Sequence, residues 1–139
     1  MITDPIALGE VQHEWSSVVT LANWSRSYAT LGGFINETPP EGYYNLPLIV
    51  AFCALDDFLL QCVEESIFNM PSGVKKRFQL GDRMDASRSK LVWQDFDTVD
   101  AGRKARNDLA HRAVVCSKEK CFEYINAIGK EFYHWGIIT

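Results

Sequence analysis

The sequence predicts an all-α fold, a four- to five-helix up-and-down bundle. Apolar residues recur every three to four positions in several long stretches, and Pro- and Gly-containing segments separate these stretches. No stretch shows the apolar–polar alternation that is typical of a strand. Short connections between the later helices favour antiparallel neighbours. Without a linker-like segment, residues 1–139 are expected to form a single domain that folds without disulfides.

The first helix is expected to start at Thr3-Asp4-Pro5, where a capping side chain precedes a proline at the first helical position. A helical period of apolar residues continues for about 25 residues, and Gly32-Gly33 is expected to end the helix. The segment from Phe34 to Asn45, which contains Pro39-Pro40, is expected to be a loop.

The second helix is expected to open at Asn45 and Pro47 and to stop at the segment from Asn69 to Gly73. Its apolar stripe consists of Leu48, Phe52, Leu55, Leu59, Val63 and Ile67.

The pattern is weaker in the middle of the chain. The charged stretch from Val74 to Lys90 favours short helical pieces joined by a turn. A helix is expected from about Thr98 to about Ala113, and Val114 to Cys116 resemble a turn. Ser117 then resembles the cap of a last helix that runs to about Trp135.

Charge is unevenly distributed along the chain. The net charge is −4, which argues against indiscriminate binding of nucleic acids. The segment from Val74 to Arg112 contains ten Lys or Arg and six Asp, a balance of +4, so the rest of the chain has a balance of −8. This basic segment in an acidic body is typical either of a solvated helix face or of a surface that binds phosphates.

The chain shows no signal-peptide order and no apolar run of the roughly 20 residues that cross a bilayer. We therefore expect a cytoplasmic protein without a membrane partner, whose four cysteines are reduced thiols. A zinc site built from His111, Cys116 and Cys121 is a minor alternative, because the spacing matches no known finger. No cofactor and no metal is expected.

The segment that points to chemistry is Arg106-Asn107-Asp108-Leu109-Ala110-His111. On a regular helix, Asp100, Lys104, Asn107 and His111 fall on one face, where Asp100 and Lys104 can pair. Arg106 lies five residues before His111, which places the two side chains about 140° apart around the helix axis. They can meet only if the helix loosens near His111, if Arg106 reaches round, or if two protomers contribute to one cleft.

These residue types suit the cleavage of RNA without a metal. The reaction needs a base for the 2′-OH, an acid for the 5′-oxygen, and stabilisation of the charge on the phosphorane. Histidine is the side chain that exchanges protons near neutral pH, and arginine offers a planar, permanent cation to phosphate oxygens. The 2′-OH would also distinguish RNA from DNA. An ordinary surface role for Arg106, Asn107 and His111 is the competing interpretation.

The segment resembles the R-N-x-x-x-H form of the signature of the HEPN superfamily. The resemblance covers roughly Asp100 to Phe132, because a short turn and a last amphipathic helix follow the motif, and the helical order before it is compatible. It implies a HEPN-like bundle and a homodimer in which two motifs line one cleft. It also implies metal-independent endoribonuclease activity, in a toxin–antitoxin or phage-defence setting with a possible antitoxin or defence-system partner.

Carried over by position, the resemblance makes His111 the acid or base, Arg106 the group that binds the phosphate and the transition state, and Asn107 a supporting polar residue. Asp100 is compared with an acidic residue that precedes the motif in some members. The neighbouring cations Arg103, Lys104 and Arg112 are expected to bind the substrate. One branch has a tyrosine two residues after the histidine. This chain has Ala113 there, so membership of that branch is not indicated.

The alternative function is a non-catalytic helical dimer that binds RNA, a nucleotide or a protein partner, which the acidic net charge and small size would suit. Asp56 and Asp57 on the second helix are interpreted as a solvated acidic face. A weaker hypothesis is that one of them orients Arg106.

Overall fold

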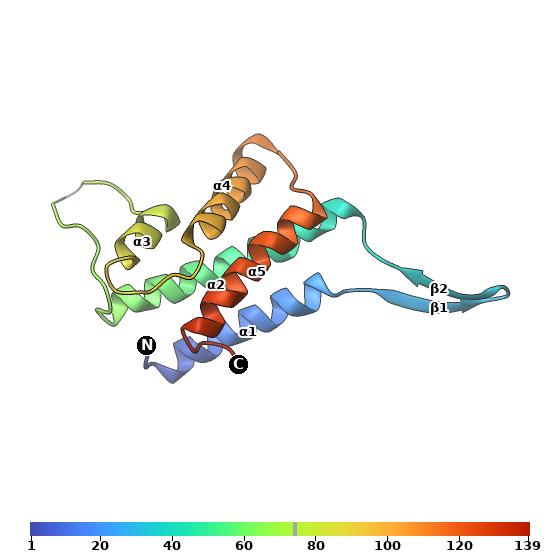
Figure 1. Ribbon diagram of the computed structural model, residues 1–139, viewed down its shortest axis with the longest axis horizontal. Helices are drawn as coiled ribbons and strands as arrows, with labels where there is room; N and C mark the ends of the chain where they lie inside the picture. The colour runs from blue at the N-terminus through green and yellow to red at the C-terminus, as the bar shows by residue number, and fades with distance from the viewer. Residues whose placement is uncertain (74) are drawn as a thin grey trace.

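The computed structural model describes residues 1–73 and 75–139, and within them the chain is mostly helical with one small sheet (Figure 1). The elements are α1 (Pro5–Ala22), β1 (Arg26–Thr30), β2 (Gly33–Glu37), the 3-10 helix η1 (Glu41–Tyr44), α2 (Asn45–Glu64), α3 (Leu80–Ser87), α4 (Phe96–Arg112) and α5 (Lys118–His134). The all-α prediction is therefore confirmed at the level of the main elements, with a hairpin added.

Helix α2 lies at the centre of the arrangement, where it contacts α1, α3, α4 and α5. Asn45 at the start of α2 binds the backbone of Cys116 just before α5, and Phe58 near the end of α2 stacks on Trp135 at the end of α5. The two helices therefore run in the same direction, and α1 and α4 run against them. Consecutive long helices are antiparallel, and for α4 and α5 this agrees with the short connection between Arg112 and Lys118.

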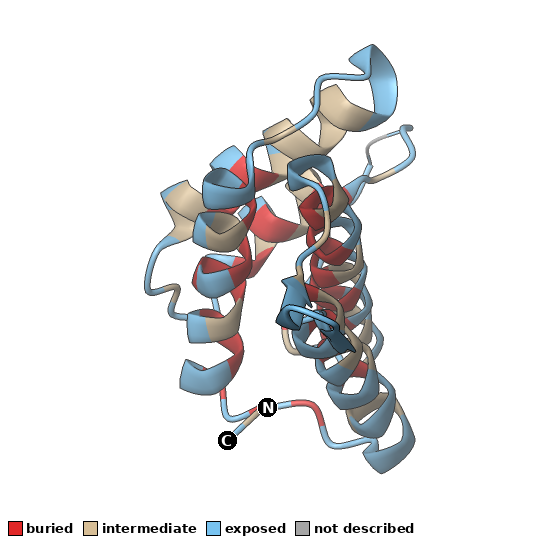
Figure 2. Cartoon of the chain, turned by 90° about the vertical axis from the view of Figure 1, so that its right-hand side faces the viewer, coloured by how far each residue is buried: buried red, intermediate tan, exposed pale blue. Residues whose placement is uncertain are grey.

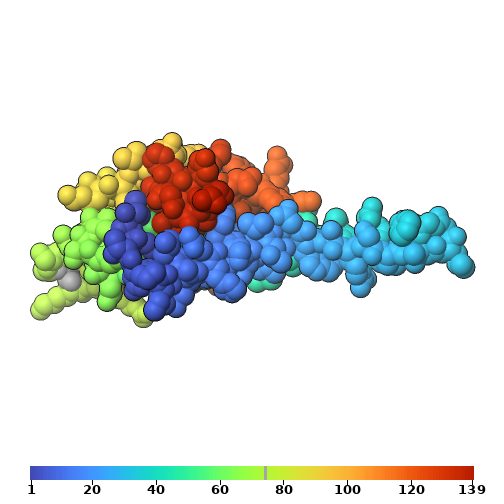
Figure 3. All heavy atoms as spheres, turned by 90° about the horizontal axis from the view of Figure 1, so that it is seen from below, coloured from blue at the N-terminus to red at the C-terminus, as the bar shows by residue number. Residues whose placement is uncertain are grey.

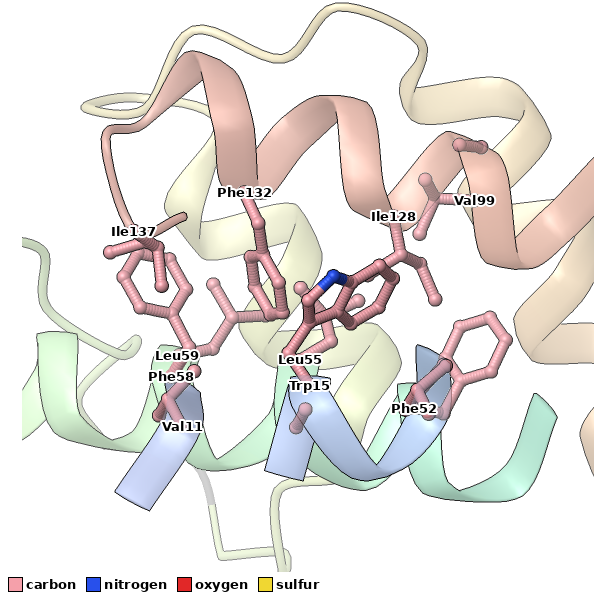
Figure 4. Close-up of a cluster of buried hydrophobic side chains, with 14 of the residues drawn as sticks. Val11, Trp15, Phe52, Leu55, Phe58, Leu59, Val99, Ile128, Phe132 and Ile137 are labelled. Carbon is pink, nitrogen blue, oxygen red and sulfur yellow. The ribbon is translucent and has the colours of Figure 1, made fainter. Parts of the chain in front are cut away.

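The core fills the space between α1, α2 and α5 (Figure 4). The ring of Trp15 from α1 packs edge-on against Phe132 of α5, and Phe58 of α2 contacts the same Phe132. Buried segments gather where the helices face one another, whereas the hairpin is exposed along its length (Figure 2). Burial of these large apolar side chains is the main source of stability.

The first helix is shorter than the sequence predicts. It ends at Ala22, and the residues assigned to its last turns form β1, which pairs with β2 in an unbroken antiparallel register from Arg26↔Glu37 to Thr30↔Gly33. The prediction of a helix up to Gly32-Gly33 is wrong, because this glycine pair belongs to the hairpin turn and Gly33 has a φ of +127°. The prediction of no strand is wrong for the same segment.

The expected loop from Phe34 to Asn45 is also corrected in part, since it contains β2 and η1. Helix α2 starts at Asn45 as predicted, and it ends at Glu64, before Ile67. Of the helical pieces expected between Val74 and Lys90, α3 is present. Val74 itself lies outside the described residues.

The predicted helix starts are confirmed by their hydrogen bonds. The Asp4 carboxylate accepts hydrogen bonds from the backbone N–H groups of Ile6 and Ala7, and Pro5 occupies the first helical position. The Ser117 hydroxyl accepts a hydrogen bond from the Lys120 N–H at 3.2 Å. Both caps satisfy backbone donors that the helix itself cannot pair.

By length and apolar composition, the segment Glu41–Glu64 could cross a membrane, and half of the apolar window is buried inside the structure. The central helix of a water-soluble domain meets the same criterion, so this finding is weak evidence for a membrane span.

Gly102 gives a direct test of the helix packing. A Cβ atom at this position would lie 2.8 Å from Cβ and Cγ of Tyr124 and 3.0 Å from Cζ of Phe52. Gly102→Ala should therefore lower the free energy of unfolding by about 1–3 kcal/mol, measured by urea denaturation. In α1, Gly9 has no heavy atom within 4 Å of such a Cβ, so Gly9→Ala should raise stability by about 0.5–1 kcal/mol. Equal effects of the two substitutions would contradict this packing.

Candidate active site

The start of α4 is held by a buried carboxylate on α5. Glu131 is fully buried and accepts hydrogen bonds from the backbone N–H groups of Gln94 at 2.9 Å and Asp95 at 2.7 Å. The Asp95 side chain in turn caps α4 by accepting a hydrogen bond from the Thr98 N–H. The start of α4, the helix that carries Arg106 and His111, is thus fixed to α5.

The end of α4 is held from α2. Ala113 has a left-handed backbone (φ 55°), which stops the helix directly after Arg112. The Asn45 amide then donates a hydrogen bond to the Cys116 carbonyl at 2.9 Å and accepts one from the Cys116 N–H at 3.0 Å. Sequence analysis identified Asn45 only as a helix start, because nothing in a linear pattern shows a contact across 71 residues.

Arg106 is half-buried between α4 and α2. Its guanidinium carbon lies 5.8 Å from the centre of the Phe52 ring, and its Nη2 donates a hydrogen bond to the Asn107 side-chain oxygen at 3.0 Å. It forms no ion pair within the described part of the chain, so its other N–H groups are available to a phosphate. Asn107 thus holds one nitrogen of the Arg106 guanidinium.

His111 is exposed in the last turn of α4. The helix stays α-helical up to Arg112, so it does not loosen near His111. Arg106 is turned toward Phe52 and Asn107. Within one chain, Arg106 and His111 therefore point in different directions and do not meet in this structure.

Asp100 organises the basic residues on the first half of α4. Its carboxylate accepts a hydrogen bond from Arg103 at 2.8 Å and lies 3.2 Å from the Lys104 ammonium, as predicted for Lys104. Burial raises the pKa of Asp100, but the bonds from Arg103 and Lys104 outweigh burial and leave the pKa below its usual value. Asp100 is therefore a carboxylate that positions cations.

The three predicted substrate-binding cations differ in accessibility. Arg103 is turned toward α3, and a Cβ atom added to Gly81 of α3 would lie 3.1 Å from its guanidinium. The side chain of Arg103 is 20% exposed. The side chains of Lys104 and Arg112 are 68% and 71% exposed, and the ion pair of Arg112 with Asp108 is long, at 3.7 Å. Lys104 and Arg112 can reach a ligand, whereas Arg103 is held in place by its neighbours.

The hypothesis that Asp56 orients Arg106 is wrong, because Asp56 forms an ion pair with Arg83 of α3, whose Nε donates a hydrogen bond to the Asp56 carboxylate at 2.8 Å. Asp57 instead lies beside Glu14 of α1. Burial, followed by the neighbouring carboxylate of Asp57 and then that of Glu10, raises the pKa of Glu14 to about 7. The Glu14 Oε2 atom is buried without a hydrogen-bond partner in the described residues.

Two sides of α2 thus differ in charge. The exposed thiol of Cys53 lies within electrostatic range of Arg106 and of Asp57 and Glu14. Burial, the largest effect, raises the pKa of this thiol, and only Arg106 opposes the rise. The outer surface of α2 therefore has a cationic edge toward α4 and an acidic edge toward α1.

All four cysteines are free thiols, and burial raises the pKa values of Cys62 and Cys121 to about 12. Within the described residues, no group of three or more His, Cys, Asp or Glu side chains is arranged to hold a metal ion. The zinc arrangement of His111, Cys116 and Cys121 is accordingly not formed there.

Comparison with family models, with curated proteins and with solved structures found no match to this chain.

The raised pKa of Glu14 predicts how stability depends on pH. Between pH 4.5 and about 7, the folded state holds a proton on Glu14. The unfolded chain, in which this carboxyl group has its ordinary pKa of 4.5, has released it. The free energy of unfolding should therefore fall as pH rises through this window. Glu14→Gln should reduce that fall and should make the chain more stable than wild type at about pH 8.

Urea denaturation at about pH 5 and pH 8 measures this difference. The exposed α3 residue Asp85, changed to Asn, serves as the control and should keep the wild-type pH dependence. A Glu14→Gln chain with unchanged pH dependence would show that this carboxyl group does not hold the extra proton.

Proposed function

We propose that this chain is a metal-independent endoribonuclease with a HEPN-like fold, and that it acts as a homodimer on RNA. The observation that carries the proposal is the state of the two motif residues on one rigid helix. Arg106 is held by Asn107 with its other donors free, and His111 is open to solvent. A guanidinium and an imidazole in these states are the groups that transesterification of RNA needs.

In the proposed reaction, His111 of one protomer exchanges protons with the reacting oxygens. Arg106 of the other protomer binds the phosphate and stabilises the charge of the transition state. The 2′-oxygen attacks the adjacent phosphorus, the bond to the 5′-oxygen breaks, and a 2′,3′-cyclic phosphate and a 5′-hydroxyl result. Lys104 and Arg112, both well exposed, bind flanking phosphates.

Helix geometry supports the proposed dimer beside the resemblance. Five residues on a regular helix separate two side chains by about 140°, and α4 is regular through both positions. A phosphodiester can contact both groups when a second copy of α4 supplies one of them.

Cleavage of a fluorescently labelled RNA in EDTA tests the proposal. His111→Ala and Arg106→Ala should each lower the cleavage rate by about 10²–10⁴. The matched control is His13→Ala, an exposed histidine on α1, which should cleave at the wild-type rate. Circular dichroism should show folded variants, because neither motif side chain is fully buried.

Two further measurements sharpen this test. An all-deoxy substrate should remain intact, since it lacks the 2′-OH nucleophile. A mixture of the two inactive variants should recover part of the activity, since a heterodimer holds one intact pair of Arg106 and His111. A folded His111→Ala chain that cleaves like wild type would refute the assignment. Intact RNA recovered after salt-dependent binding would instead favour a non-catalytic binding module.

A further inference from the structure

The second half of α5 and the facing part of α1 form a groove with a volume of about 680 Å³. We call it the α5 groove. The end of the chain (red) lies against α1 (blue), and the hairpin leaves the body elsewhere without covering this region (Figure 3). The volume is typical of sites that hold small organic molecules. The groove is lined by Trp15 of α1 and by Asn126, Gly129, Lys130, Tyr133 and His134 of α5.

Aromatic rings form the apolar part of the α5 groove. A Cβ atom on Gly129 would lie 2.9 Å from Cζ2 of Trp15, so the missing side chain lets the indole pack directly against the α5 backbone. Tyr133, one turn further along the same side of α5, is 69% exposed. Ile138 adds an aliphatic side chain to the lining. A planar ring bound here would cover apolar surface of Trp15 and Tyr133.

The α5 groove carries positive charge, although the chain as a whole has a net charge of −4. Lys130 and His134 line it, and among the described residues no Asp or Glu does. Neither cation forms an ion pair in the described part of the chain. His134 lies in the last turn of α5, where the helix dipole by itself favours a cation. Lys130 is therefore the group that indicates a ligand.

Two carboxylates near Lys130 are already engaged with backbone groups. Asp95 lies within electrostatic range of Lys130, but its side chain caps α4 by accepting a hydrogen bond from the Thr98 N–H. Glu131 is buried and accepts hydrogen bonds from the N–H groups of Gln94 and Asp95. The Lys130 ammonium thus lines an aromatic groove without an anion of this chain to neutralise it.

We propose that the α5 groove binds a small aromatic carboxylate. The ring of the ligand packs on Trp15 and Tyr133, and its carboxylate accepts a charge-assisted hydrogen bond from Lys130. The side-chain amides of Gln94 and Asn126, which also line the groove, bind polar substituents of the ring because an amide both donates and accepts hydrogen bonds.

The composition of the groove favours this class over a polyanion. A nucleic acid would need several cations spaced along its phosphates, whereas the α5 groove offers Lys130 and His134, one turn apart, beside an apolar floor. One acidic group joined to one ring matches that arrangement.

This inference goes beyond the proposed function and does not depend on it. His111 lies at the end of α4, and the chain reaches the start of α5 at Lys118. Lys130 lies a further twelve residues along α5, which is about 18 Å at 1.5 Å per residue. The α5 groove is therefore at the other end of α5 from the motif histidine.

Isothermal titration calorimetry with 2-naphthoate tests the proposal. Wild type should bind this probe with a Kd of about 0.1 mM, an ordinary value for a ligand of this size. The alcohol 2-naphthylmethanol has the same ring without the charge and should bind at least about tenfold more weakly. Acetate, which has the charge without the ring, should give no saturable binding.

Substitutions separate the charge from the ring. Lys130→Gln should weaken the binding of 2-naphthoate about tenfold and leave that of 2-naphthylmethanol unchanged. Tyr133→Ala should weaken both. The matched control is Lys120→Gln on the same helix, where Lys120 pairs with Glu123 outside the groove, and it should bind like wild type. Circular dichroism should show folded variants, since all three side chains are exposed.

The indole N–H signals in a ¹H–¹⁵N NMR spectrum locate the bound probe. Addition of 2-naphthoate should shift the signal of Trp15, assigned with Trp15→Phe, and should leave that of Trp24 before β1 unchanged. A shift at Trp24 without one at Trp15 would place the probe elsewhere and refute the α5 groove.

Three other results would overturn the proposal, whether or not the chain cleaves RNA. The first is no saturable binding of 2-naphthoate up to about 10 mM. The second is binding that Lys130→Gln leaves at the wild-type Kd. The third is tighter binding of AMP than of 2-naphthoate, which would make the ligand a nucleotide. Binding of 2-naphthoate that depends on Lys130, in a chain that leaves RNA intact, would support the α5 groove and count against the nuclease alone.

Discussion

The candidate site depends on how closely α4 approaches α2 and α5. Helix α4 carries Arg106, Asn107 and His111, yet only Val99 and Gly102 of its residues are fully buried. Because α4 buries so little apolar area, the close fit of its backbone against α2 and α5 holds it in place. The missing side chain at Gly102 lets its backbone approach Tyr124 more closely than even an alanine would allow. The same approach brings the Arg106 guanidinium beside the Phe52 ring.

Two buried polar residues hold the segments on either side of this helix. Glu131 binds the backbone before α4, and Asn45 binds the backbone after it. Each residue pairs with partly buried backbone groups and is itself buried, so removing either one is expected to cost more than a surface hydrogen bond. The motif therefore sits on a rigid element that is fixed at both ends, and this favours a preorganised site.

The long helices could be predicted from sequence because each buries one face. The spacing of apolar residues locates α2 and α5 well, and the caps at Asp4 and Ser117 lie where their residue types indicate. The hairpin of β1 and β2 could not be found in this way. Strands are recognised by one buried face, and every residue of β1 is exposed, so burial leaves no alternation to detect. Its glycine pair also suits the end of a helix.

In the candidate site, the angle between Arg106 and His111 on one helix could be predicted from the sequence, but the residues around them could not. Helical geometry fixes the separation of Arg106 and His111 from sequence alone. The fold adds that Asp56 is paired with Arg83 and that Arg103 is turned toward α3. Neither contact has a signal in the chain, because each joins elements that only the tertiary fold brings together.

The distribution of charge then determines which surface a polyanion, such as the proposed RNA substrate, can approach. The chain as a whole is acidic, and Glu10, Glu14 and Asp57 concentrate negative charge on the α1 edge of the outer α2 surface. A polyanion is repelled from that edge and attracted to α4, where Lys104 and Arg112 are exposed. Under the proposed function, the acidic body would therefore direct the phosphates of RNA away from α1 and toward α4, which carries the motif residues.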